Sequence, residues 1–358
     1  MFVDKRSIKK ILVLRYRSIG DIILSGPALQ ALRLTFPDAR IDMVVDDVFA
    51  DLCRGNPFIN GLVLHRRERG DLSKWAYFKM NLRFMWKIRK QKYDLVVDLH
   101  SGPRSAALTM FSGARYRLGY QFRLRNKLAY NIPAPLGGKG IHTVDVLLQT
   151  LGPLGVKIPD ERRLFLQCRD GEREYVRDFL SKYGISTEND FIVLMHPGAR
   201  MEEKRLPAEK MGAVARWLVD ELGVKVVYAG NNNDIEEISK IVKFSGRRGL
   251  LATNLPLGRL AALIEASNLF LGNDSGPTHM ASALGTPLVA FFGPSDPSVW
   301  GPLGENARVV VNSPLLECQP CDQKKCALSG DHCMTKIRIN DVKREITGLI
   351  SHRAARRV

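Results

Sequence analysis

The sequence lacks any apolar run long enough to cross a membrane. A membrane-spanning helix needs about 18 or more consecutive apolar residues, and no stretch of this 358-residue chain approaches that length. Residues 1–10 lead into a short apolar strand without a cleavage site of small residues, so we expect no secretion signal there. We therefore expect the protein to reside in the cytoplasm.

Acidic residues are scarce relative to basic ones. The 37 Asp and Glu residues face 54 Lys and Arg residues, which gives a net charge of +17. Most of the excess lies in residues 65–92, with ten basic and two acidic residues, and in residues 104–127, with six basic and none acidic. Such a field favours an anionic partner: a phosphorylated substrate, an acidic membrane face or a nucleic acid. Charge alone does not choose among them.

The composition is that of a globular protein with about two domains. Hydrophobic residues make up 45% of the chain and charged residues 25%, which excludes a disordered chain, and 358 residues suffice for two cores. Strand–helix–strand patterns occupy residues 10–45 and 191–229. Alternating strands and helices predict parallel sheets with right-handed crossovers.

A segment rich in Gly and Pro, residues 151–159, separates the two halves and is typical of a hinge. We expect an N-terminal domain over residues 1–165 and a C-terminal domain over residues 166–335. In the tail, residues 336–358, apolar side chains recur at helical spacing. The tail is therefore predicted to be an amphipathic helix that packs on the domains.

The most informative motif is Asp274-Ser275-Gly276-Pro277, which follows an apolar strand at residues 268–272. Asp274 or Ser275 can cap a helix, Pro277 suits its first turn, and Gly276 lets a ligand approach the backbone. A helix N-terminus at the carboxyl end of a strand binds anions, above all a diphosphate. His279, one turn further on, would face the same crevice. The alternative is an ordinary β-α-β unit with a capped helix and a core histidine.

This motif extends into a longer pattern. Asp-Ser-Gly-Pro-x-His-x-Ala-x-Ala-Leu-Gly-Thr-Pro, followed by Phe-Gly-Pro-x-Asp-Pro, closely resembles the C-terminal signature of glycosyltransferase family 9, the ADP-heptose:lipopolysaccharide heptosyltransferases. Residues 11–37 resemble the family's N-terminus, and the resemblance covers nearly the whole chain. It implies a GT-B fold: two Rossmann-like, doubly wound α/β domains that face a central cleft. The first domain would bind the acceptor and the second the nucleotide sugar.

The same resemblance implies an activity. The protein would be an inverting glycosyltransferase that moves heptose from ADP-L-glycero-D-manno-heptose to the inner core of lipopolysaccharide, a Kdo/heptose–lipid A acceptor. It would work at the anionic inner face of the cytoplasmic membrane as a peripheral protein, without a required cofactor and without nucleic acid. The acceptor position and the exact donor sugar stay open.

Three residues receive roles in this interpretation. Asp21 is the candidate base, because the family's Gly-Asp pair carries the base; the alternative is that Asp21 caps a helix. Lys204 matches the diphosphate-binding lysine of the family's Pro-Gly-Ala…Lys-x-Trp-Pro loop, although Leu206 stands in place of the Trp. Asp234 follows a strand and would lie near the nucleoside; the alternative is again a helix cap.

Basic residues in or near loops of the first domain would bind the carboxylates and phosphates of the acceptor. We expect this of them as a group: Arg15, Arg17, Arg104, Arg117 and His142. A second basic feature is a helical stripe of Trp75, Phe78, Leu82, Met85 and Trp86, interleaved with Lys and Arg. The stripe either lies on an anionic bilayer or packs on the first domain.

Four of the six cysteines form a tight set: Cys318, Cys321, Cys326 and Cys333. In a cytoplasmic chain four thiols at close spacing indicate a zinc or iron–sulfur site, but this spacing differs from the common CxxC…CxxC pattern. We expect a structural role, with structural zinc as an alternative. The rival functions are a basic nucleic-acid-binding protein with a four-cysteine metal site, and a GT-B transferase or epimerase that uses another nucleotide sugar.

Overall fold

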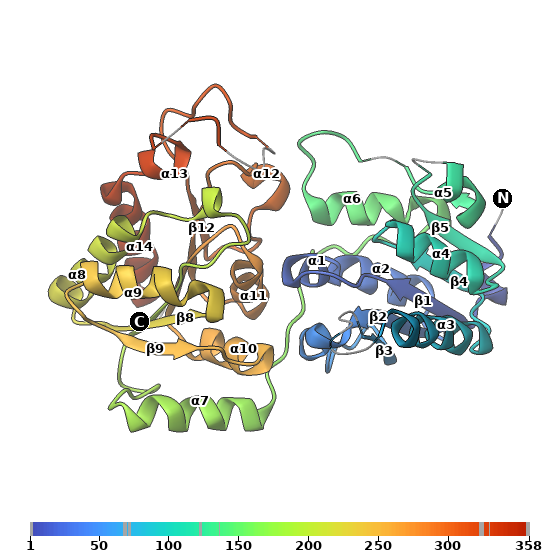
Figure 1. Ribbon diagram of the computed structural model, residues 1–358, viewed down its shortest axis with the longest axis horizontal. Helices are drawn as coiled ribbons and strands as arrows, with labels where there is room; N and C mark the ends of the chain where they lie inside the picture. Colours follow the sequence, from blue (N-terminus) through green and yellow to red (C-terminus); the bar gives the residue numbers. More distant parts are fainter. Residues whose placement is uncertain are drawn as a thin grey trace. The chain divides into compact units, whose positions relative to one another are not determined.

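The structure is a computed structural model that describes residues 3–66, 70, 73–121, 124–135, 137–321, 326–328 and 330–355. The chain divides into two compact units, Met1–Phe165 and Leu166–Val358. Each unit contains one six-stranded sheet with helices packed against it (Figure 1). Among the described residues, no helix has the length and apolar character needed to cross a membrane.

All strand pairs in the first unit are parallel, in the order β3-β2-β1-β4-β5-β6. Its strands are β1 Lys10–Leu14, β2 Arg40–Asp46, β3 Gly61–His65, β4 Leu95–Asp98, β5 Tyr116–Gly119 and β6 Ile132–Pro133. Its helices are α1 Ile19–Leu24, α2 Gly26–Thr35, α3 Lys74–Lys90, α4 Pro103–Phe111, α5 Leu124–Ala129 and α6 Thr143–Thr150. The order is that of a Rossmann-like sheet, whose switch point lies between β1 and β4.

The second unit repeats this order as β9-β8-β7-β10-β11-β12, again with parallel pairs. Its strands are β7 Ile192–His196, β8 Lys225–Gly230, β9 Leu250–Thr253, β10 Leu269–Asn273, β11 Leu288–Phe291 and β12 Ala307–Val310. Its helices are α7 Asp170–Lys182, α8 Ala208–Leu222, α9 Ile235–Phe244, α10 Leu257–Ala266, α11 Gly276–Leu284, α12 Pro297–Trp300, α13 Cys333–Lys336 and α14 Ile339–Ala355. Its switch point lies between β7 and β10.

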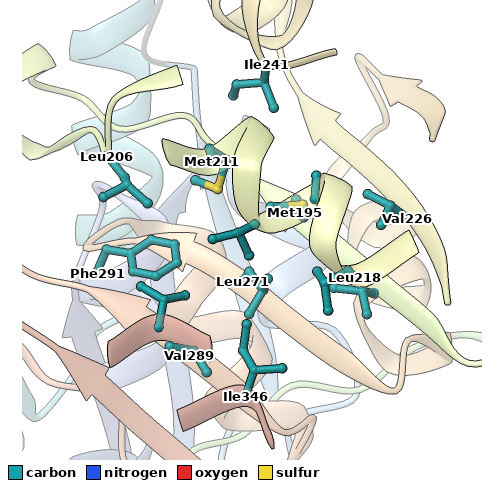
Figure 2. Packing of buried hydrophobic residues seen from close by; sticks show 14 of the residues in the cluster. Met195, Leu206, Met211, Leu218, Val226, Ile241, Leu271, Val289, Phe291 and Ile346 are labelled. Atoms are coloured by element: carbon teal, nitrogen blue, oxygen red, sulfur yellow. The ribbon is translucent and has the colours of Figure 1, made fainter. Parts of the chain in front are cut away.

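The central strands are continuous apolar runs because both faces of each sheet are covered. Residues 11–14 of β1 and 269–272 of β10 are buried, as is typical of parallel sheets between two helix layers. In the second unit, Met195 and Leu271 pack in one core with Leu218 of α8 and Ile346 of α14 (Figure 2). Truncating a fully buried Leu in such a core costs about 2–5 kcal/mol of the free energy of unfolding.

The tail helix belongs to the second unit. Helix α14 packs against α8, β11 and β12, and Val342, Ile346 and Leu349 are buried there. The helix expected within the strand–helix–strand pattern of residues 10–45 is divided in two. It is broken at Ser25, which ends α1 and precedes α2, because Pro27 in the first turn of α2 cannot donate a hydrogen bond to the turn before it.

Candidate functional site

The predicted site residues gather at the switch points of the two sheets. In open parallel sheets, ligands bind outside the carboxyl ends of the strands where the strand order reverses. Asp21 and Arg15 follow β1 in the first unit, and Asp274 follows β10 in the second. Each unit therefore has candidate residues at the carboxyl ends of its central strands, and we call this place the edge of that unit.

Asp21 lies in the first turn of α1, where two side chains hold its carboxylate. Arg15 Nη2 donates to Asp21 Oδ1 at 2.7 Å, and Ser18 Oγ donates to Oδ2 at 2.8 Å. Arg15 also donates to the Leu99 carbonyl oxygen, so it joins Asp21 to the loop after β4. A carboxylate can accept about four hydrogen bonds. Because 26% of the Asp21 side chain is exposed, a further hydroxyl can reach it.

The alternative role of Asp21 as a helix cap is wrong. The N-cap of α1 is Ser18, whose Oγ accepts a hydrogen bond from the Asp21 N–H at 3.3 Å. Ser18 has a φ of 60°, a strained conformation for a residue with a side chain, of the kind found at ligand sites. Asp21 is the third residue of the helix, where the helix dipole favours a carboxylate.

A histidine that the sequence analysis did not select lies beside this carboxylate. Burial lowers the pKa of His100, and the charges of Arg15 and Arg17 lower it further, against the opposite effect of Asp21. The imidazole of His100 is therefore neutral at pH 7. Its position two residues after the end of β4 is the signal that could have identified it.

The five basic acceptor candidates separate into two groups. Arg15 and Arg17 lie near His100, and Arg104 lines a cavity of about 280 Å³ that also contains Tyr16. Arg117 and His142 have structural bonds instead.

Arg117 donates to the carbonyl oxygens of Ala114 and Ala129, each at 2.8 Å. His142 is the N-cap of α6 and accepts from the Val144 N–H at 3.2 Å. We therefore treat Arg17 and Arg104 as the leading acceptor candidates. The described bonds of Arg15, Arg117 and His142 are structural, and their contact with the acceptor stays a prediction.

Helix α3 exposes most of the aromatic stripe found in the sequence. Trp75 is 62% exposed, Phe78 51% and Trp86 54%, whereas the half-buried Met85 packs on the core of the first unit. Trp75 and Phe78 stack with 5.6 Å between ring centroids, and Lys79 Nζ lies 5.1 Å from the Trp75 centroid. Packing on the first unit therefore explains Met85 and the edge of Trp86 that meets Phe111 of α4, with 5.4 Å between the ring centroids, but it leaves at least half of each of the three aromatic side chains exposed.

In the second unit, Lys204 and Asp274 form an ion pair at the end of β10. Lys204 Nζ lies 2.6 Å from Asp274 Oδ2, which also accepts from Ser295 Oγ at 2.5 Å. The side chain of Asp274 is 8% exposed and that of Lys204 25%. Two anions repel each other, so Asp274 positions the lysine and is not itself a phosphate ligand.

The N-terminus of α11 lies directly after this ion pair. Its N-cap, Ser275, makes no capping bond with its side chain, and Pro277 stands in the first turn. The Ser275 Oγ is buried without a hydrogen-bond partner among the described residues. Backbone N–H groups at such a helix start attract a phosphate. His279 is 4% exposed within α11, as the core-histidine alternative requires, so its role as a ligand stays a prediction.

Asp234 caps a helix start, as the alternative to a nucleoside contact predicts. It is 3% exposed, accepts from the Asn231 N–H at 3.0 Å, and completes a reciprocal capping box with Asn231. Its other oxygen lies 3.6 Å from Arg205 Nη2. A Cβ at Gly198 would lie 2.6 Å from this carboxylate, so only a glycine fits there. The contact of Asp234 with the nucleoside therefore stays a prediction beside its observed role as a cap.

Two buried residues that the sequence analysis missed shape the loop containing Lys204. Asn273 Nδ2 donates to the Pro197 carbonyl oxygen at 2.6 Å, and Asn273 Oδ1 accepts from the Leu206 N–H at 2.9 Å. Asn273 thus fastens both ends of the loop to β10. His196, at the end of β7, is buried, and burial lowers its pKa against the opposing charge of Asp234. Both lie directly at strand ends, which is the signal that could have found them.

All six cysteines are free thiols. Burial raises the pKa of both Cys53 and Cys168 to about 12, so both thiols are protonated. The other four cysteines line one pocket together with Glu203 and His332. Within the described part of the chain, no three His, Cys, Asp or Glu side chains already have the arrangement of a metal centre.

Comparisons with known proteins place these sites in context. Residues 81–332 match the model of glycosyltransferase family 9 (heptosyltransferase). The lipopolysaccharide heptosyltransferase 3 of Escherichia coli (strain K12) is 29% identical over 297 residues, which cover 80% of this chain and 83% of the relative.

Two solved structures are similar over nearly the whole chain. The glycosyl transferase family 9 protein from Veillonella parvula DSM 2008 has a TM-score of 0.84 and 27% identity, and the match covers 96% of this chain and 97% of that one. The ADP-heptose lps heptosyltransferase II of E. coli has a TM-score of 0.76 and 23% identity, with 96% and 99% covered. At this identity the second likeness shows the fold alone.

Proposed function

The chain belongs to glycosyltransferase family 9, the heptosyltransferases, and we propose that it transfers heptose from ADP-L-glycero-D-manno-heptose to the inner core of lipopolysaccharide. Its fold is GT-B, with two Rossmann-like units, as predicted. The observation that carries the proposal is the pairing of Lys204 with Asp274 beside the N-terminus of α11. The names of the relatives, lipopolysaccharide heptosyltransferases 2 and 3, support heptose and lipopolysaccharide as the substrates.

The second unit would hold the departing ADP. When the bond between the anomeric carbon and the diphosphate oxygen breaks, its electron pair stays on ADP, so negative charge grows on the diphosphate. Lys204 Nζ and the N–H groups at the start of α11 would stabilise that charge. Asp274 contributes by fixing the lysine, because its Oδ2 accepts from Lys204 Nζ at 2.6 Å. Ser295 Oγ donates to the same oxygen at 2.5 Å and so holds the carboxylate in place.

Asp21 would supply the base. As the acceptor hydroxyl oxygen forms its bond to the anomeric carbon, its proton passes to the Asp21 carboxylate. Arg15 and Ser18 hold one carboxylate oxygen each, which orients the carboxylate for the incoming hydroxyl. A single displacement of this kind inverts the anomeric configuration. Arg17 and Arg104 would bind the anionic groups of the acceptor.

Membership of the family argues against the alternative of a nucleic-acid-binding protein. The other alternative, a donor with another nucleotide, is decided by the following test. We would measure the thermal unfolding temperature with ADP, UDP, GDP and a DNA duplex, each separately. A ligand of the native state at a hundredfold excess over its Kd adds about 2.7 kcal/mol. We expect a shift with ADP alone. A shift with UDP or GDP instead would mean that the donor sugar is carried by that nucleotide. A shift with DNA alone would contradict the proposal.

We also propose that the protein binds the anionic inner face of the cytoplasmic membrane through α3. This helix carries six Lys and Arg and no acidic residue, and Trp75, Phe78 and Trp86 are exposed on it. Basic charge together with exposed aromatic rings is typical of helices that lie on anionic lipid. The surface would bring the enzyme to its lipid-anchored acceptor.

Flotation with phosphatidylglycerol-containing vesicles tests this surface. We expect the wild type to float at low salt and the variant Trp75→Ser/Trp86→Ser to remain in the soluble fraction. The matched control is Trp300→Ser, which changes a 38% exposed Trp of the second unit. Equal flotation of the wild type and the double variant would contradict the proposal.

A further inference from the structure

We propose that Cys318, Cys321, Cys326 and Cys333 bind one Zn²⁺ ion next to the donor site. The proposal goes beyond glycosyl transfer and stands on the pocket that these four thiols share. Its second part, an effect on ADP binding, rests on the proposed function.

The four thiols line one narrow pocket. Its cavity measures about 20 Å³, which is the space of a single water molecule or ion. Its other lining is largely apolar, with Pro294, Leu316 and Leu328. Few hydrogen-bond partners are available to the sulfur atoms in such surroundings, and thiolates brought together there need a cation between them.

A polar atom in the wall of the pocket has no partner. His332 lines the pocket next to Cys333, and its Nδ1 is buried without a hydrogen bond to any group that the structure describes. Buried polar atoms are seldom left without a partner, and ligand sites are a frequent reason for one. The orphaned nitrogen thus indicates that a group is missing at this place, and in the site proposed here its N–H would donate to one of the zinc-bound thiolates.

The backbone fixes the two ends of the cysteine segment on the loop after β11. The Cys321 N–H donates to the Pro294 carbonyl oxygen at 2.7 Å, and Gln319 Nε2 donates to that of Gly293 at 2.8 Å. At the other end, a Cβ at Gly293 would lie 2.8 Å from Cys333 Sγ, so the missing side chain admits this thiol. Both ends of the segment are therefore held within one unit before any ion binds.

Four thiolates are a complete ligand set for tetrahedral Zn²⁺, with Zn–S distances of about 2.3 Å. No three of the described thiols already stand in that arrangement. The buried Cys333 would therefore stay in place, while the exposed Cys318 and the half-buried Cys321 and Cys326 turn inward. Binding would then stabilise the fold of the second unit, as structural zinc sites do.

The pocket adjoins the residues that hold Lys204. Glu203 lines the pocket and precedes Lys204 in the chain, and Pro294 precedes Ser295, which donates to Asp274. An ion held here would fix both segments behind the diphosphate site. We therefore expect removal of the ion to weaken ADP binding, although no cysteine touches the nucleotide.

The test measures the metal content of the full chain by mass spectrometry. The protein is purified without chelators and under reducing conditions. We expect about one zinc ion per chain, and a thiolate-to-cobalt absorption band when Co²⁺ replaces zinc. The variant Cys326→Ser should lose both signals, whereas Cys53→Ser, which changes an isolated buried cysteine of the first unit, should keep them. Circular dichroism confirms that each variant is folded.

Metal analysis would overturn the proposal in three cases: iron in place of zinc, no metal after incubation with equimolar Zn²⁺, or a Cys326→Ser variant that retains zinc. If thiol titration of the unreduced protein finds two free thiols instead of six, disulfides replace the metal site. Metal content is measured without substrate, so its failure is distinct from a failure of the proposed function. ADP titration of the zinc-free protein then tests the second part separately.

Discussion

The two units have the same strand order, yet the helices at their switch points begin in opposite ways. In the first unit, Ser18 caps α1 with its side chain, and the third helical residue presents a carboxylate. In the second unit, Ser275 makes no such cap, and a lysine stands beside the start of α11. In the proposed mechanism, one topology thus provides a proton acceptor at one switch point and an anion site at the other.

The comparison teaches that the local residues, and not the fold, decide the charge of each site. A helix start whose N–H group is capped by a side chain, and which also carries a carboxylate, suits a base. The helix dipole and an arginine hold that carboxylate in place. An uncapped start suits a diphosphate, because the N–H groups and a cation both attract it. Variants that change one edge at a time test this division.

The largest effect is expected from Asp21→Asn. The amide cannot accept the hydroxyl proton, so turnover at saturating donor and acceptor should fall by about 10²- to 10⁴-fold. The measurement is release of ADP in a coupled assay. Asp38→Asn, an exposed acid of the same unit, should retain normal turnover. An Asp21→Asn enzyme that turns over at more than half the wild-type rate would rule out the base assignment.

Lys204→Ala should weaken ADP binding by about 10- to 100-fold, because a hydrogen bond to a charged group contributes about 1.5–3 kcal/mol. Titration calorimetry measures the Kd. Lys240→Ala, an exposed lysine of α9 in the same unit, is the control and should bind ADP normally. Unchanged affinity in Lys204→Ala would show that the lysine serves the fold and not the ligand.

A smaller effect is expected from removing the cap that distinguishes the first edge. Ser18→Ala loses both the cap of α1 and the bond to Asp21 Oδ2, at a cost of about 1 kcal/mol in the free energy of unfolding. Denaturant titration measures it. We also expect a lower kcat with an unchanged KM for the donor, and a change confined to that KM would contradict the comparison.

The smallest effect concerns pH. Burial lowers the pKa of His196 in the folded state, so the unfolded chain binds its proton first as the pH falls. Stability is therefore lost on acidification through the unfolded pKa near 6.5, by at most about 0.7 kcal/mol between pH 7 and pH 6. A His196→Gln variant should show a shallower pH dependence of unfolding over this interval. An identical slope in the variant would show that a group other than His196 causes the pH dependence.

The sequence predicts the parts of the fold that depend on local pattern. The apolar runs of β1 and β10 predict buried parallel strands, and the Asp274–Pro277 motif predicts a helix start after a strand. Both are present. The break between α1 and α2 was missed, although Pro27 marks it, because the apolar spacing continues across it.

The site residues were predicted less completely for a physical reason. Asp234, Arg117 and His142 have side chains suited to ligands, but bonds within their own unit use them as caps and braces. Conversely, Asn273 fastens Pro197, 76 residues away in the chain. Such pairings depend on which strand ends become neighbours, and a single sequence contains no direct record of them.

The two switch points have separate tasks if Asp21→Asn and Lys204→Ala differ in their Kd for ADP. The account predicts that Asp21→Asn binds ADP like the wild type while Lys204→Ala binds it about 10- to 100-fold more weakly. Equal weakening in both variants would contradict the account, because the carboxylate edge would then belong to the nucleotide site.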